Sequence, residues 1–150
     1  MLVADICTKA VVTCAPEDRL LDAARKMRDQ HVGAVVVIEQ REGVVVPVGV
    51  VTDRDVVVDA VVPQLDRIGE LRVADLASRE IVVVNAGVNV DRALEIMSEA
   101  GVRRAPVVDG RGALVGIVTI DDLIETLAAR LIGVVAVIRK QQIRERKELA

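Results

Sequence analysis

The sequence predicts an α/β (α+β) fold made of two β-α-β-β-α repeats, packed as a pseudo-twofold pair and followed by an extended C-terminal helix. Three observations predict it: the two halves of the chain match each other, each half alternates β-branched runs with amphipathic stretches, and an apolar stripe continues past the second half. With 150 residues, 52% of them hydrophobic, the chain can bury a core and lacks the composition of a disordered protein.

Two blocks of sequence carry the internal repeat. The block around Met27, LLDAARKMRDQHVGAVVV, matches the block around Met97, VDRALEIMSEAGVRRAPVV, and VGVVTDRD at 48–55 matches VGIVTIDD at 115–122. The spacing differs slightly between the blocks, so we place a short insertion in the turn at 39–47. Because one half alone would leave a sheet face uncovered, we expect the two halves to form one unit.

Each repeat is predicted to begin with a short apolar strand, at 10–13 and at 81–84, followed by a turn at Pro16 or Gly87. An amphipathic helix comes next, because apolar residues recur at positions i, i+3, i+4 and i+7. These residues are Leu20, Ala23, Ala24 and Met27 in the first repeat and Val90, Ala93, Leu94 and Met97 in the second.

A β-hairpin is expected after each of these helices, since two β-branched runs are joined there by a turn that contains glycine. The runs are 35–38 with 48–51, and 107–108 with 114–118. Their valine content, with little polar alternation, indicates strands that are covered on both faces. A second helix is predicted to begin at a Thr-x-x-Asp motif after each hairpin.

Residues 1–62 are expected to form the first repeat, 63–72 a connector, 73–128 the second repeat and 129–150 a C-terminal helical extension. From 121 to 150 the pattern predicts one long or broken helix, with Gly133 as its weak point. Its apolar stripe is longer than one repeat needs, which favours a partner chain; a helix folded back on its own module is a close alternative. The stripe consists of Leu123, Leu127, Leu131, Val134 and Ile138.

The repeated motif Gly-x-x-Thr-x-x-Asp is the main candidate for a functional site. It places Thr52 and Asp55 in one copy, and Thr119 and Asp122 in the other, where a strand ends and a helix begins. One interpretation is a helix cap, in which threonine accepts from a backbone N–H and the acid bonds back. The other is half of a nucleotide site, with the carboxylate accepting ribose hydroxyls and the threonine lying beside a phosphate.

This duplicated motif in a β-α-β-β-α frame resembles a tandem pair of CBS domains, often called a Bateman module. The segments 31–38 and 101–109 also match, and the resemblance extends from about residue 3 to residue 126. It implies adenosine-nucleotide binding in the cleft between the repeats, where the motif of one repeat faces the first strand and the Arg-x-Pro region of the other. It also implies a homodimer shaped as a flat disc of four domains.

The resemblance implies two sites, with aspartate holding the ribose, threonine the phosphate side and aliphatic side chains enclosing the adenine. The first would use Thr52, Asp53, Arg54 and Asp55, with Val82, Val83, Val102 and Arg103. The second would use Thr119, Asp121 and Asp122, with Ala10, Val11, Val32 and Gly33.

The two sites differ in their supply of positive charge. The second repeat offers Arg103 and Arg104, whereas the matching positions of the first repeat are Gly33 and Ala34, so the second site would depend on another cation such as Lys9. Since guanidinium groups suit phosphate, we expect the Asp55 site to take the charged nucleotide. The competing interpretation is that the two arginines form surface ion pairs.

Composition and spacing exclude several classes of function. The chain is 0% aromatic with a net charge of −3, which argues against nucleic acid as a partner. Cys7, Cys14 and His31 lack metal-ligand spacing, a single histidine supports no catalytic triad, and no phosphate-binding Walker motif is present. The N-terminal residues do not resemble a signal peptide and no segment is apolar enough to cross a membrane, so a cytoplasmic protein is expected.

The sequence therefore predicts a non-catalytic regulatory module that senses AMP, ADP or ATP, with S-adenosylmethionine as a further candidate ligand. We expect it to require no cofactor, to form a homodimer and to act in trans on an unidentified protein target. The alternative is a structural dimerisation module with vestigial clefts. A composite active site across a dimer is a third interpretation, which the absence of catalytic groups disfavours.

Overall fold

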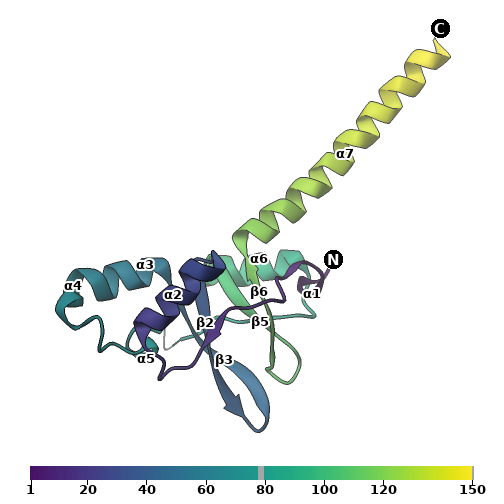
Figure 1. Cartoon of the computed structure of the whole chain (residues 1–150). Helices are drawn as coiled ribbons and strands as arrows, with labels where there is room; N and C mark the ends of the chain where they lie inside the picture. The colour runs from purple at the N-terminus through teal and green to yellow at the C-terminus, as the bar shows by residue number, and fades with distance from the viewer. Residues whose placement is uncertain (78–79, 150) are drawn as a thin grey trace.

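The computed structural model describes residues 1–77 and 80–149, and these form two similar halves around two three-stranded sheets (Figure 1). In each sheet the first strand runs parallel to the second, and the second runs antiparallel to the third. The predicted fold class is thereby confirmed. The first half contains α1 (Val3–Ile6), β1 (Thr13–Cys14), α2 (Leu20–Gln30), β2 (Ala34–Arg41), β3 (Val44–Thr52), α3 (Asp53–Asp55), η1 (Val56–Val61), α4 (Val62–Gln64) and η2 (Leu65–Arg67).

The second half repeats the pattern without the short helices that close the first. It contains α5 (Val73–Leu76), β4 (Val84–Asn85), α6 (Val90–Ala100), β5 (Arg104–Val108), β6 (Leu114–Thr119) and α7 (Ile120–Glu148). The first strand of each half starts later than predicted, at Thr13 and Val84. Four of the residues before these strands, Ala10, Val11, Ile81 and Val82, line the space between the two halves.

The helices α2 and α6 have the predicted apolar faces, and both end in a left-handed residue. That residue is His31, with φ 54°, in the first half and Gly101, with φ 65°, in the second. In both, the backbone N–H of this residue donates to carbonyls of the last helical turn, as helix C-caps commonly do. His31 thus caps the C-terminal end of α2.

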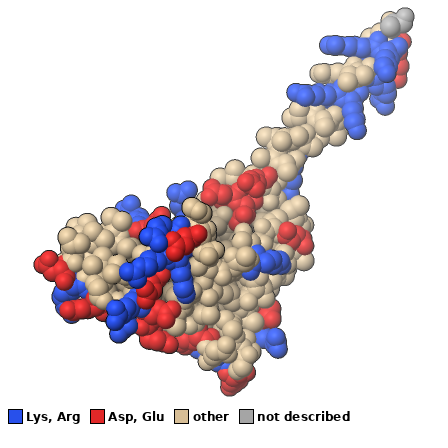
Figure 2. Space-filling view, in the orientation of Figure 1, with Lys and Arg blue, Asp and Glu red and all other residues tan. Residues whose placement is uncertain are grey.

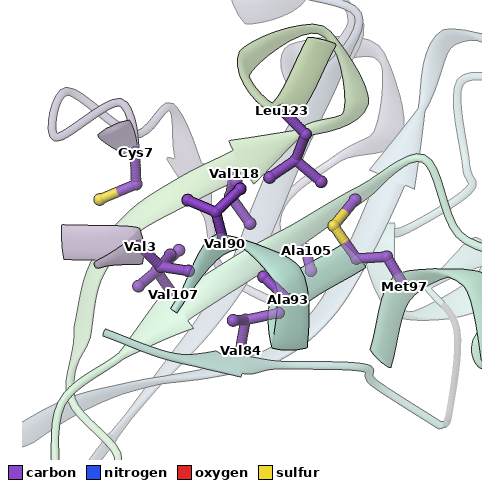
Figure 3. Packing of buried hydrophobic residues seen from close by; sticks show 10 residues of the cluster. All are labelled: Val3, Cys7, Val84, Val90, Ala93, Met97, Ala105, Val107, Val118 and Leu123. Carbon is purple, nitrogen blue, oxygen red and sulfur yellow. The ribbon is translucent and has the colours of Figure 1, made fainter. Parts of the chain in front are cut away.

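Each half completes its core with a segment from the other half. Val3 and Cys7 pack in the core of the second half (Figure 3). Leu71 and Val73 pack in the core of the first. Backbone bonds hold the N-terminal segment there: Thr8 and Ile117 exchange two hydrogen bonds of 2.9 Å. The domain boundaries drawn from the sequence remain a prediction, and these two cores cross them.

The C-terminal helix α7 is one continuous helix that stands away from the rest of the molecule (Figure 1). Gly133 does not interrupt it, and Ala150, which the predicted helix included, lies outside the described residues. Beyond Thr126 its side chains are exposed. In the part of the chain that the structure describes, no helix combines the length and apolarity that a membrane crossing requires.

Candidate functional site

Two clefts lie where the halves meet, and each takes its motif from one half and its opposite wall from the other. The Thr52 cleft encloses about 500 Å³ and the Thr119 cleft about 270 Å³. Small-molecule sites typically occupy about 300–1,000 Å³, so the Thr52 cleft has the more suitable size. The Thr52 cleft is lined by Val50, Thr52, Asp53, Arg54, Asp55, Glu80, Ile81, Val82, Gly101, Val102, Arg103 and Arg104. The Thr119 cleft is lined by Thr8, Ala10, Val11, Val12, Val32, Gly33, Ala34, Arg103, Arg104, Ile117, Thr119, Ile120 and Asp121.

In the Thr52 cleft the motif forms a helix cap and still leaves polar atoms available. The backbone N–H of Thr52 donates to Asp55 Oδ2 at 2.8 Å, and the backbone N–H of Asp55 donates to Thr52 Oγ1 at 3.1 Å. Asp55 Oδ1 accepts no hydrogen bond, and the Thr52 hydroxyl finds no acceptor, within the described part of the chain. The capping interpretation is therefore realised, and it leaves one acceptor and one donor beside the cleft.

The second copy forms the same cap but uses its polar atoms internally. Asp122 Oδ2 accepts from the Thr119 backbone N–H at 2.7 Å and from the Thr119 hydroxyl at 2.8 Å. Asp122 does not line the Thr119 cleft; it lines a separate surface hollow with Glu125 and Arg130. The neighbouring Asp121 takes its place at the cleft. This copy thus offers a ligand fewer free groups than the first.

Arg103 and Arg104 line both clefts, because they lie at the start of β5, where the two halves meet. Neither guanidinium forms an ion pair or a hydrogen bond with any side chain in the described ranges, so the surface ion-pair interpretation is wrong. The need for another cation at the second site is also wrong: Lys9 donates to the Ala4 carbonyl at 2.9 Å instead of lining the cleft.

Gly33 makes room for one of these guanidinium groups. A Cβ atom at this position would lie 3.1 Å from Arg104 Nη1 and 3.3 Å from Asp53 Oδ2. The glycine carbonyl also accepts the Asp53 backbone N–H at 3.1 Å. Three parts of the chain therefore meet between the clefts: the turn before β2, the start of α3 and the guanidinium of Arg104 from the opposite half.

The structure brings most of the predicted site residues to the clefts. Thr52, Asp53, Arg54, Asp55, Val82, Val102 and Arg103 line one, and Ala10, Val11, Val32, Gly33, Thr119 and Asp121 line the other. It does not bring Val83, which is 37% exposed, or Asp122 to either lining. Sequence reasoning did not assign Thr8 or Ile117 to a site, since their pairing joins residues that are remote in the chain.

The cysteines lie apart from both clefts. Cys7 and Cys14 are buried free thiols in the two separate cores. Burial raises the pKa of the Cys14 thiol to about 11, with Lys26 acting in the opposite direction. Among the described residues, no three His, Cys, Asp or Glu side chains are grouped as a metal ion would need.

Comparison with known proteins gives consistent matches. The family model of the CBS domain matches residues 3–59 and 73–129. An uncharacterised protein of Methanopyrus kandleri is 32% identical over 123 residues, which are 82% of this chain but only 61% of that protein. The CBS domain-containing protein YhcV of Bacillus subtilis is 36% identical over 121 residues, 81% of this chain and 81% of that one.

A solved structure matches the fold closely. The CBS domain pair of protein MJ0100, in complex with 5′-methylthioadenosine and S-adenosyl-L-methionine, has a TM-score of 0.73. The match covers 87% of this chain and 98% of that one at 22% sequence identity. At 22% identity, this similarity shows that the two chains share a fold.

Proposed function

This chain belongs to the CBS-domain family as a tandem pair, and on that premise we propose that it is a regulatory module that binds an adenine nucleotide in the Thr52 cleft. The observation that carries the proposal is a pair of guanidinium groups, those of Arg103 and Arg104, that have no carboxylate partner among the described residues. They line the cleft together with the free polar atoms of Thr52 and Asp55. Protein arginines without partners at a cleft favour an anionic ligand.

Each part of a nucleotide has a counterpart in this cleft. Asp55 Oδ1 is the acceptor for a ribose hydroxyl, since Oδ2 is already used by the cap. The Thr52 hydroxyl and the two arginines are donors for phosphate oxygens. Ile81, Val82 and Val102 supply an aliphatic wall, against which an adenine ring can pack in a chain without aromatic residues.

The Thr52 cleft is the better of the two for this ligand. It is larger, and the hydroxyl hydrogen of Thr52 is free. Thr119, in contrast, donates its hydroxyl hydrogen to Asp122 of the same motif. Because both clefts share the same two arginines, a phosphate bound in one reduces the charge available to the other. We therefore propose one occupied cleft with AMP, ADP or ATP, and S-adenosylmethionine as the further candidate.

The proposed module has no chemistry of its own and acts on a separate protein target, in a homodimer. Its cleft linings contain no histidine or cysteine among the described residues. To regulate a target, the nucleotide must bind two states of the module unequally. The segments best placed to report occupancy are those that meet at Gly33, since they come from both halves.

Paired aspartate variants test the proposal. Asp55→Asn and Asp122→Asn both keep an acceptor oxygen for the cap, but only Asp55 lines the nucleotide cleft. We expect adenine nucleotides to raise the melting temperature of the wild type and of Asp122→Asn, and Asp55→Asn to bind roughly 10-fold more weakly, because a charged hydrogen bond is lost.

Two results would contradict this assignment. Equal losses of affinity in both variants would show that the aspartates act only through the caps. The melting temperature could also stay unchanged with AMP, ADP, ATP and S-adenosylmethionine, in a protein that still dimerises. That result would favour the structural dimerisation module with vestigial clefts.

A further inference from the structure

The helix α7 carries an apolar seam that nothing in the described structure covers. Ile124, Leu127, Leu131, Val134 and Ile138 follow one another at alternating spacings of three and four residues, which place them on one face of the helix. They are 40% to 66% exposed. In contrast, Leu123, one position before the seam, is fully buried and anchors the base of the helix in the second half.

This spacing is that of the core positions of a coiled coil. One core position of the seven-residue repeat is occupied by Ile124, Leu131 and Ile138. The other is occupied by Leu127 and Val134. A helix of 29 residues is about 44 Å long, so the seam can pack along a second helix for several turns. Because α7 is already helical and held at its base, pairing does not have to pay for helix formation.

Charge along α7 determines the direction of pairing. Its first turns carry Asp121, Asp122 and Glu125, whereas its last turns carry Arg139, Lys140, Arg144, Arg146 and Lys147 with two glutamates. Figure 2 shows this distal basic group beyond an uncharged middle section. In a parallel pair the basic ends would lie side by side, and Glu145, which continues the seam spacing, would face its own copy. In an antiparallel pair each basic end lies near the acidic base of the other helix.

We propose that α7 pairs antiparallel with α7 of a second copy of this chain, through the seam from Ile124 to Ile138. The two modules then lie at opposite ends of the helix pair, an arrangement that differs from the flat disc that the family resemblance implies. No residue of the seam itself lines either cleft.

Cysteine cross-linking tests the direction. Ile124→Cys and Ile138→Cys lie about 21 Å apart on one helix, but within about one turn of each other across an antiparallel pair. With a short bismaleimide we expect cross-linked dimers when the two variants are mixed, and little product from either variant alone. The native thiols, Cys7 and Cys14, are buried, so the wild type is the background control. Efficient cross-linking of Ile138→Cys alone would mean a parallel pair and would overturn the proposal.

A charge placed in the seam tests the pairing itself. We expect Leu131→Glu to weaken dimerisation by roughly 100-fold, measured as mass by light scattering over a concentration series, because two buried leucines are replaced by two like charges. Ile132→Glu is the matched control, since Ile132 is 69% exposed on the same helix but off the seam. Equal dimerisation of wild type and Leu131→Glu would overturn the proposal, since the dimer would then form elsewhere.

A monomeric wild type would also overturn it. If that monomer bound vesicles of phosphatidylcholine and phosphatidylserine, and Leu131→Glu did not, the occupant of the seam would be a lipid surface. If the monomer bound no vesicles, the seam of α7 would pack neither against a second copy nor against a lipid surface.

Discussion

The hydroxyl hydrogen of Thr119 is donated to Asp122 Oδ2, whereas that of Thr52 has no acceptor among the described residues. At the residue scale this is the main difference between the two copies of the motif, because both make the same backbone cap. A cap satisfies the N–H groups that a helix start leaves without partners, and it does not by itself indicate a ligand. What identifies a candidate site is the set of polar atoms that remain after the cap is formed.

The arginine pair gives a prediction at this scale. In Arg103→Gln combined with Arg104→Gln, we expect affinity for ADP and ATP to fall by roughly 10-fold to 100-fold, since charge-assisted hydrogen bonds to phosphate are lost. Affinity for adenosine, measured by the same calorimetric titration, should hardly change. Arg111→Gln is the control, because Arg111 lies on the exposed turn of the second hairpin. An equal loss for adenosine would count against the phosphate role.

A second prediction concerns the Cys14 thiol. Burial raises its pKa from 9.0 in the unfolded reference to about 11, so the folded protein favours the protonated thiol. This contribution to stability is present below pH 9 and is lost as the pH rises from 9 toward 11. We expect the free energy of unfolding of the wild type, from urea titrations at pH 8 and 10, to fall more than that of Cys14→Ala. Equal decreases would contradict a buried, protonated thiol.

At the element scale, the N-terminal segment passes directly over β6 at the glycine of the second motif. A Cβ atom at Gly116 would lie 2.6 Å from Cys7 Sγ and 3.0 Å from the Thr8 carbonyl oxygen. The same segment pairs with Ile117 through two backbone hydrogen bonds. The glycine is therefore needed for the close approach of two chain segments, and not for an unusual backbone angle.

Gly116→Ala tests this close approach. We expect it to lower the free energy of unfolding by about 1–3 kcal/mol, because Thr8 belongs to a paired backbone and cannot move away freely. Gly110→Ala is the control, since a Cβ atom there would meet nothing within 4 Å. Chemical denaturation of both variants gives the comparison. A Gly116→Ala protein as stable as the control would mean that the N-terminal segment shifts without cost.

At the scale of the whole molecule, the two halves depend on each other for their cores. Val3 is fully buried in the core of the second half, and Val73 is fully buried in the core of the first. Each half thus receives a segment from the other, and neither half can complete its core from a continuous stretch of sequence. This mutual dependence also fixes the two clefts, which have walls from both halves.

Cooperative unfolding follows from the exchanged segments. We expect a single calorimetric transition with equal calorimetric and van't Hoff enthalpies. Val3→Ala should lower the free energy of unfolding by about 2 kcal/mol without splitting the transition, whereas Leu2→Ala, at an exposed position, should have little effect. Two resolved transitions in the wild type would show that the halves unfold independently.

The sequence by itself determined the elements and their order. Apolar spacing places α2 and α6, the β-branched runs place the hairpins, and the Thr-x-x-Asp motif marks where helices start, because these signals depend on residues close together in the chain. The resemblance to tandem CBS domains, which these motifs carry, also predicted most of the residues that line the clefts.

Only the tertiary structure decided which aspartate faces a cleft, that one arginine pair serves both clefts, and that α7 extends away from its own module. The physical reason is that Asp55 and Asp122 have the same local cap, while their surroundings depend on segments remote in sequence. Local hydrogen bonds and periodicity are written in consecutive residues, but the environment of a side chain is set by how distant segments pack.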